Sequence, residues 1–284
     1  MIDWAWLVLR AAGLMLTFQA AGAALFEAAF APQLGQARPA IRRAARRASL
    51  AALAVLAAQL LFEPVHLAGE TSGLTDPRLL RLFLGSSAAT AFAVRFLGIA
   101  AVAVGARQHA RRAQVLGVAG ALVAAGSFLL TGHTAVDRGR LLLAPLLLVH
   151  LTIVAFWFGS LRPLRQLIVL EAPAAAARAL AAFSAVAVWL VPLIAVAGLG
   201  MAVLLLPDVA ALWRPYGLAL LTKVTLFALL MALAALNRLR LTPAFARGEA
   251  AAGTALRRSI ALEYMLVCVV FAVTAVMTGS FSPQ

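Results

Sequence analysis

The sequence contains few charged residues. Only 12% of its 284 residues are Asp, Glu, Lys or Arg, about half the share in a typical soluble domain, whereas 64% are apolar. A soluble enzyme would need a charged surface that this chain does not have, so the composition indicates a membrane protein and excludes a soluble enzyme. We expect the protein not to be an enzyme. The single cysteine, Cys268, excludes an internal disulfide and a CxxC metal site.

Eight long apolar runs follow one another along the chain. Each exceeds the roughly 17 residues that a helix needs to cross a bilayer, and none shows the alternating pattern of a transmembrane strand. We therefore predict an all-α fold, a polytopic membrane helical bundle that forms one domain over residues 1–284. The predicted spans are residues 4–30, 48–68, 86–104, 114–131, 141–161, 183–206, 217–239 and 258–279.

The basic residues favour one side of this bundle. Of the 24 Lys and Arg residues, which outnumber 10 Asp and Glu, sixteen lie in the connections that follow the odd-numbered spans. The positive-inside rule places these connections in the cytoplasm, so both termini are predicted to be periplasmic. Because topology accounts for the net charge of +14, we expect no nucleic-acid partner. The sixteen are Arg38, Arg42, Arg43, Arg46, Arg47, Arg107, Arg111, Arg112, Arg162, Arg165, Arg178, Arg238, Arg240, Arg247, Arg257 and Arg258.

A few ionisable side chains fall inside the predicted spans, where each costs about 2.5–3.5 kcal/mol at mid-span and is a functional candidate. The spacing of Gln59, Glu63 and His66 places them on one face of the second span. We interpret this face as a cation entrance, a proton relay or an interfacial cap. Arg95, near the middle of the third span, needs a partner for its charge. We predict an ion pair with Glu63, the acidic residue nearest to it in depth. Lys223 lies about two turns into the seventh span and can extend toward the outer surface.

Histidine and methionine supply candidate ligands for a soft ion such as Cu(I), which prefers imidazole nitrogen and thioether sulfur. His150 lies about ten residues into the fifth span, roughly 15 Å deep at 1.5 Å per residue. The alternative for His150 is a hydrogen bond to a neighbouring helix, and the alternative for each methionine is core packing. The candidate metal ligands are His66, His133, His150, Met15, Met201 and Met277.

Three segments resemble the copper resistance protein D (CopD) family. They are TGHTA followed by VHLTIVAFWFGSLRPL, the Lys-led span LLTKVTLFALLMALAALNRLRLTP, and the last span ALRRSIALEYMLVCVVFAVTAVMTGSFSP. The resemblance covers residues 114–283, and the first three spans fit by number and topology. By position, His133, His150 and Lys223 match the family's pattern.

This resemblance implies an eight-span inner-membrane protein that moves copper from the periplasm toward the cytoplasm, supplied by a separate periplasmic copper-binding protein. We therefore predict copper transport or binding in copper homeostasis or resistance, with Cu(I) as the ion. Glu63, Arg95 and Lys223 are assigned a structural or charge-relay role. One alternative is a haem b redox protein with two axial ligands among His66, His133 and His150. Another is an assembly subunit whose small-residue helices serve only packing.

Overall fold

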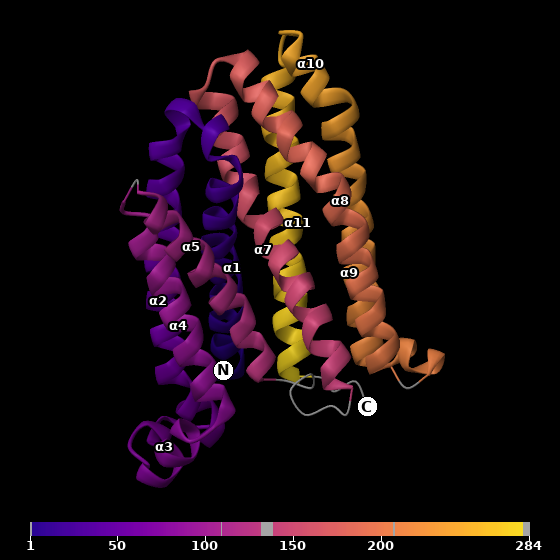
Figure 1. Ribbon diagram of the computed structural model, residues 1–284. Helices are drawn as coiled ribbons and strands as arrows, with labels where there is room; N and C mark the ends of the chain where they lie inside the picture. The colour runs from indigo at the N-terminus through magenta and orange to yellow at the C-terminus, as the bar shows by residue number, and fades with distance from the viewer. Residues whose placement is uncertain (1, 109, 132–138, 207, 281–284) are drawn as a thin grey trace.

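The computed structural model describes residues 2–108, 110–131, 139–206 and 208–280. Every secondary structure element within these ranges is a helix. The long helices stand side by side in one bundle (Figure 1). The start of α1 (Ile2–Phe30) and the end of α11 (Ala252–Ser280) lie at the end of the bundle that carries α3 (Pro77–Leu84), whereas α10 (Thr242–Ala246) lies at the opposite end.

Eight segments of the described chain are long and apolar enough to cross a membrane, which confirms the predicted all-α polytopic bundle. In addition to α1 and α11, the long helices are α2 (Arg38–Ala68), α4 (Ser87–Gly105), α5 (Arg111–Gly126), α7 (Arg140–Leu170), α8 (Pro173–Leu205) and α9 (Pro215–Leu236). Shorter helical elements connect or extend them: η1 (Ala31–Gln33), η2 (Gly35–Ala37), η3 (Thr71–Leu74), η4 (Ser127–Leu130), η5 (Val209–Trp213) and the π-helix η6 (Asn237–Leu241).

Several helices extend beyond the predicted apolar runs. α2 begins at Arg38 rather than at residue 48, and α7 continues to Leu170 rather than ending at residue 161. Parts of the predicted cytoplasmic connections are thus helical. Ala and Arg, which are frequent there, are both strong helix formers. Hydropathy identifies the part of a helix that can lie in lipid, whereas backbone hydrogen bonding continues beyond that part.

α1 joins the two halves of the bundle, since it packs against α2 and α5 on one side and against α7 and α11 on the other. Its closest approach is to α7, where a Cβ built on Gly22 would lie 1.6 Å from the carbonyl oxygen of Ala155, beside Gly159. α4 and α5 meet similarly at Gly98 and Gly120. Because lipid is as apolar as the side chains, close backbone packing rather than apolar burial holds such helices together.

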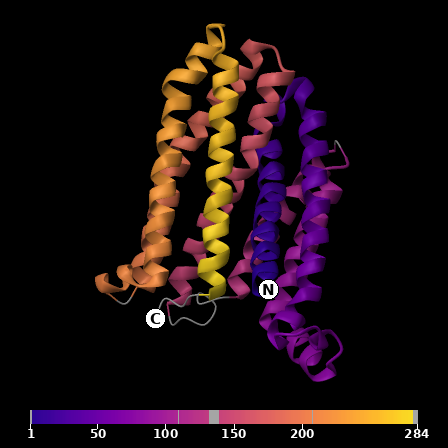
Figure 2. The same ribbon diagram turned by 180° about the vertical axis from the view of Figure 1, so that it is seen from behind.

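α8 and α9 lie at the edge of the bundle, and Figure 2 shows α11 between α9 and the N-terminal helices from the other side. α9 packs on α11, and α8 packs on α7. Large apolar side chains on both outer helices are exposed, including Trp189, Leu199, Val203 and Val224. Such a surface is suited to contact with lipid tails.

Candidate functional site

The polar stripe predicted on α2 faces α1. Gln59 Nε2 donates a hydrogen bond to the carbonyl oxygen of Leu9 at 2.6 Å. The indole Nε1 of Trp6 donates to Glu63 Oε2, also at 2.6 Å. The ring of His66 stacks on the Trp6 indole, with centroids 4.2 Å apart and an interplanar angle of 11°. The predicted shared face is therefore confirmed, and it also serves to hold α1 against α2.

Arg10 connects this group to α11. Its guanidinium carbon lies 4.8 Å from the centroid of the Trp6 ring, and its Nη2 donates to Thr278 Oγ1 at 2.9 Å. Met277, the neighbour of Thr278, is buried with 5% of its surface exposed. The group lies at the end of the bundle where α1 begins. We define the α1–α2–α11 cluster as Trp6, Arg10, Glu63, His66 and Thr278.

Arg95 of α4 does not pair with Glu63, so the predicted ion pair is wrong. Arg95 Nε donates to Ser127 Oγ at 3.0 Å. Its guanidinium carbon lies 3.7 Å from the centroid of the Phe128 ring and 5.6 Å from that of Phe92. A hydroxyl and two aromatic faces thus stabilise the charge in place of a carboxylate. Similar depth suggested Glu63, but depth does not define which face of a helix a residue occupies.

His150 is partly buried in the C-terminal half of the bundle, where α7 packs on α8. A Cβ built on Gly198 would lie 3.7 Å from His150 Cε1 and 3.8 Å from Nδ1, so the ring rests on the α8 backbone. The imidazole forms a hydrogen bond with the backbone of Ile194 on α8, as its packing alternative predicts, and the charge of Lys223 on α9 also acts on it. Nδ1 is buried and has no hydrogen-bond partner in the described ranges. A buried imidazole nitrogen without a partner is available as a ligand for a soft cation.

The other predicted ligands are more dispersed. Met15 is partly buried against the main hydrophobic core, as its packing alternative predicts, and Met201 of α8 is partly exposed. His133 lies outside the described residues. His66 packs on α1 whereas His150 packs on α8, and nothing in this arrangement favours the haem alternative. The described part of the chain contains no group of three or more His, Cys, Asp or Glu side chains that could hold a metal ion.

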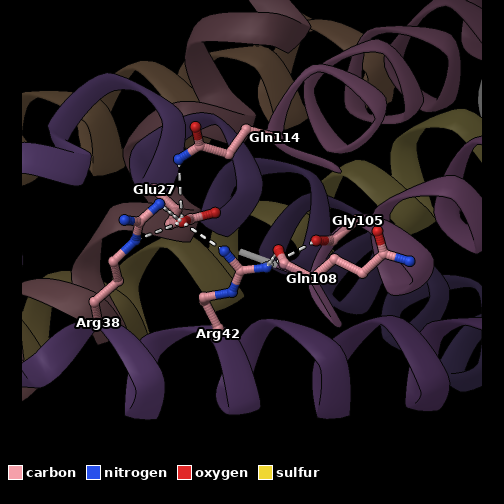
Figure 3. Close-up of polar contacts among 6 residues, drawn as sticks. All are labelled: Glu27, Arg38, Arg42, Gly105, Gln108 and Gln114. Atoms are coloured by element: carbon pink, nitrogen blue, oxygen red, sulfur yellow. Dashed lines mark hydrogen bonds and ion pairs between the residues drawn. The ribbon is translucent and has the colours of Figure 1, made fainter. Parts of the chain in front are cut away.

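A buried ion-pair cluster that the sequence analysis missed joins α1, α2, α4 and α5 (Figure 3). Glu27 is 7% exposed, and its Oε1 accepts hydrogen bonds from Arg38 Nη2 at 2.8 Å and from Arg42 Nη1 at 3.1 Å. Gln114 Nε2 donates to the same oxygen at 3.3 Å. Arg42, only 3% exposed, also donates to the carbonyl oxygen of Gly105 at 3.0 Å, at the end of α4.

A second buried carboxylate, also missed, lies between α7, η6 and α11. Glu263 is 4% exposed. It accepts hydrogen bonds from Asn237 Nδ2 and from the side chain of Trp157. Asn237 is the first residue of η6, and π-helical segments often occur at functional sites. Both Glu27 and Glu263 fall within predicted spans, so the cost of an intramembrane charge is a signal that would have found them.

Comparison with protein families accounts for most of the chain. The family model described as copper resistance protein D-like, N-terminal domain, matches residues 1–143. The model described as copper resistance protein D matches residues 177–277. The chain belongs to the copper resistance protein D family. Comparison with curated proteins and with solved structures found no match.

The family membership confirms the resemblance and extends it to the N-terminal helices. This member of the copper resistance protein D family is accordingly a multi-pass membrane protein of copper resistance. Its two matched ranges contain most of the candidate residues. The first contains Met15, Glu63 and His66, the second contains Met201, Lys223 and Met277, and His150 lies in the interval between them.

Proposed function

We propose that this chain carries Cu(I) across the inner membrane, from the periplasm to the cytoplasm, as part of copper homeostasis or resistance. The observation that carries the proposal is the buried Nδ1 of His150, which has no hydrogen-bond partner in the described residues. Imidazole nitrogen suits Cu(I), and His150 lies roughly 15 Å into α7 by helical rise. Because the chain belongs to the copper resistance protein D family, copper is the ion that we expect this nitrogen to bind.

The proposed orientation rests on the basic residues. The end of the bundle that carries α10 also carries the arginine-rich ends of the helices, and the positive-inside rule assigns that end to the cytoplasm. The α1–α2–α11 cluster then lies at the periplasmic end. We propose that the eight spans work as one membrane domain over residues 1–284 and that both termini are periplasmic.

Lys223 favours transport over storage. Its charge acts on the His150 imidazole, so it opposes a cation bound there and weakens the bound state. Conduction needs binding that is favourable enough for entry and weak enough for release. We propose that the protein is a carrier rather than an enzyme, with Cu(I) as its substrate and a separate periplasmic copper-binding protein as the donor.

The proposed route begins at His66. The imidazole there lies against the Trp6 ring at the end of the bundle that we assign to the periplasm. From this entrance the ion passes to His150, which is partly buried between α7 and α8. His133, Met15, Met201 and Met277 remain proposed ligands along the way, because imidazole and thioether are both soft donors.

Copper uptake by the purified protein in liposomes tests the proposal. With Cu(I) outside the liposomes and a Cu(I)-binding dye inside, we expect His150→Ala to lower the initial rate of uptake at least about tenfold. Loss of a residue that only supports a metal ligand already lowers metal affinity or activity by about that factor, and loss of a ligand itself should cost no less. Met265→Leu is the matched control, because Met265 is 63% exposed on α11 and its thioether lies outside the proposed route. Wild-type uptake and Cu(I) affinity in His150→Ala would contradict the proposal.

A further inference from the structure

Glu263 differs from Glu27 in its surroundings. Both carboxylates are buried, but Glu27 is paired with Arg38 and Arg42, whereas Glu263 forms no ion pair with a described residue. Its partners are the neutral side chains of Asn237 and Trp157. An isolated carboxylate buried away from water is costly when ionised and takes up a proton instead.

Two buried polar atoms on the residues around Glu263 have no hydrogen-bond partner in the described residues. Asn237 Oδ1 and Ser259 Oγ are both buried, and neither has a hydrogen-bond partner in the described residues. Ser259 precedes Glu263 by four residues, so the two side chains lie on one face of α11. An ionised carboxylate only accepts hydrogen bonds, whereas a protonated one also donates. The Ser259 hydroxyl can itself donate, but Asn237 Oδ1 can only accept, so a proton on Glu263 supplies a donor of the kind that Asn237 Oδ1 lacks.

Charged side chains on the neighbouring elements are engaged elsewhere or lie toward the helix ends. Arg162 of α7 lies over the Tyr264 ring, with its guanidinium carbon 5.1 Å from the centroid. Arg238 of η6 donates to Ser184 on α8 at 2.9 Å. Lys223 of α9 acts on His150. Among the side chains that the structure describes, the remaining charged or titratable groups on the elements packed against α11, and on α11 itself, are Arg10, Glu27, Arg140, Arg165, Tyr216, Arg240, Arg257, Arg258 and Cys268.

Glu263 lies beyond His150 in the proposed direction of transport. Its partner Trp157 is seven residues after His150 on α7, about 10 Å further along the helix axis at 1.5 Å per residue. The cytoplasmic end, as we assign it, is in that direction. A cation that leaves His150 toward the cytoplasm therefore approaches the Glu263 carboxyl group.

We propose that Glu263 is a proton-binding residue of the copper pathway, protonated when the pathway is empty and deprotonated when Cu(I) arrives. This inference rests on the proposed transport of Cu(I). The O–H bond of the carboxyl group breaks, the proton passes to water, and the carboxylate balances the charge of the arriving ion. Copper remains Cu(I), so no electrons are transferred and the net charge of the site is unchanged.

Infrared difference spectroscopy of the whole protein in detergent tests the protonation without copper. Wild type at neutral pH should show a carboxylic acid C=O band that is lost in Glu263→Gln and retained in Glu249→Gln, whose carboxylate is exposed and paired with Arg247. Asn237→Ala removes the donor to Glu263 Oε1 and should shift the same band. No band in wild type, a band that persists in Glu263→Gln, or no shift in Asn237→Ala overturns the inference.

A second measurement tests the coupling to copper. Cu(I), added as a weak chelate to the protein in lightly buffered solution with a pH indicator, should release protons in proportion to the copper bound. Glu263→Gln should lose this release, and Glu249→Gln should keep it. Equal release from Glu263→Gln and wild type overturns the coupling. If wild type binds no Cu(I) but shows the infrared band, the transport proposal fails, and the protonation of Glu263 stands without its role in copper movement.

Discussion

Removal of the Glu27 carboxylate should destabilise the protein far more than removal of its partner Arg38. In Glu27→Ala, the guanidinium of Arg42 stays buried, with only 4% of its side chain exposed, and loses its counter-charge. Loss of one partner of a buried ion pair costs about 3–5 kcal/mol. Arg42 keeps its hydrogen bond to the Gly105 carbonyl oxygen, which places the expected loss toward the lower end of this range.

The matched variant is Arg38→Ala. The Arg38 side chain is 27% exposed, and Glu27 keeps Arg42 as its partner when Arg38 is removed. Partly exposed ion pairs contribute about 0–1 kcal/mol, so the loss should stay below about 1 kcal/mol. In the double variant Glu27→Leu with Arg42→Met, both charges are removed together. Its loss of stability should be smaller than the sum of the losses in the single variants Glu27→Leu and Arg42→Met.

Equilibrium unfolding in mixed micelles, by SDS titration followed with far-UV circular dichroism, measures these differences. Equal losses in Glu27→Ala and Arg38→Ala would show that burial does not set the strength of this cluster. Additive losses in the double variant would show that Glu27 and Arg42 are not coupled. Either result would refute the reasoning.

Two further predictions concern packing and topology. Gly159→Ala should cost about 1–3 kcal/mol by overpacking, because its Cβ would lie 2.3 Å from the α1 backbone, whereas Gly126→Ala meets nothing within 4 Å. Equal unfolding midpoints in the SDS titration would contradict this contact. In a Cys268→Ser background, a membrane-impermeant maleimide should label Ser72→Cys in intact cells but Ala250→Cys only after permeabilisation. The reverse labelling would invert the proposed orientation.

The number and type of elements follow from local properties of the sequence. Continuous apolar runs predict eight membrane helices because the hydrocarbon core forces each crossing segment to satisfy its own backbone hydrogen bonds. Helical periodicity also places Gln59, Glu63 and His66 on one face of α2, and the structure confirms that face. These predictions need only the residues within one helix.

The partners of each face were decided by the tertiary structure. Trp6 and Glu63 are 57 residues apart in the sequence, and neither hydropathy nor spacing indicates that they meet. Arg95 turns toward Ser127 and Phe128 because α4 packs on α5 and η4, although Glu63 lies at a similar predicted depth. Apolar length and helical spacing are enough to predict how many helices cross the membrane and which of their faces are polar. The close packing at Gly22 and Gly159 decided how the helices are rotated about their axes, and hence which polar groups meet.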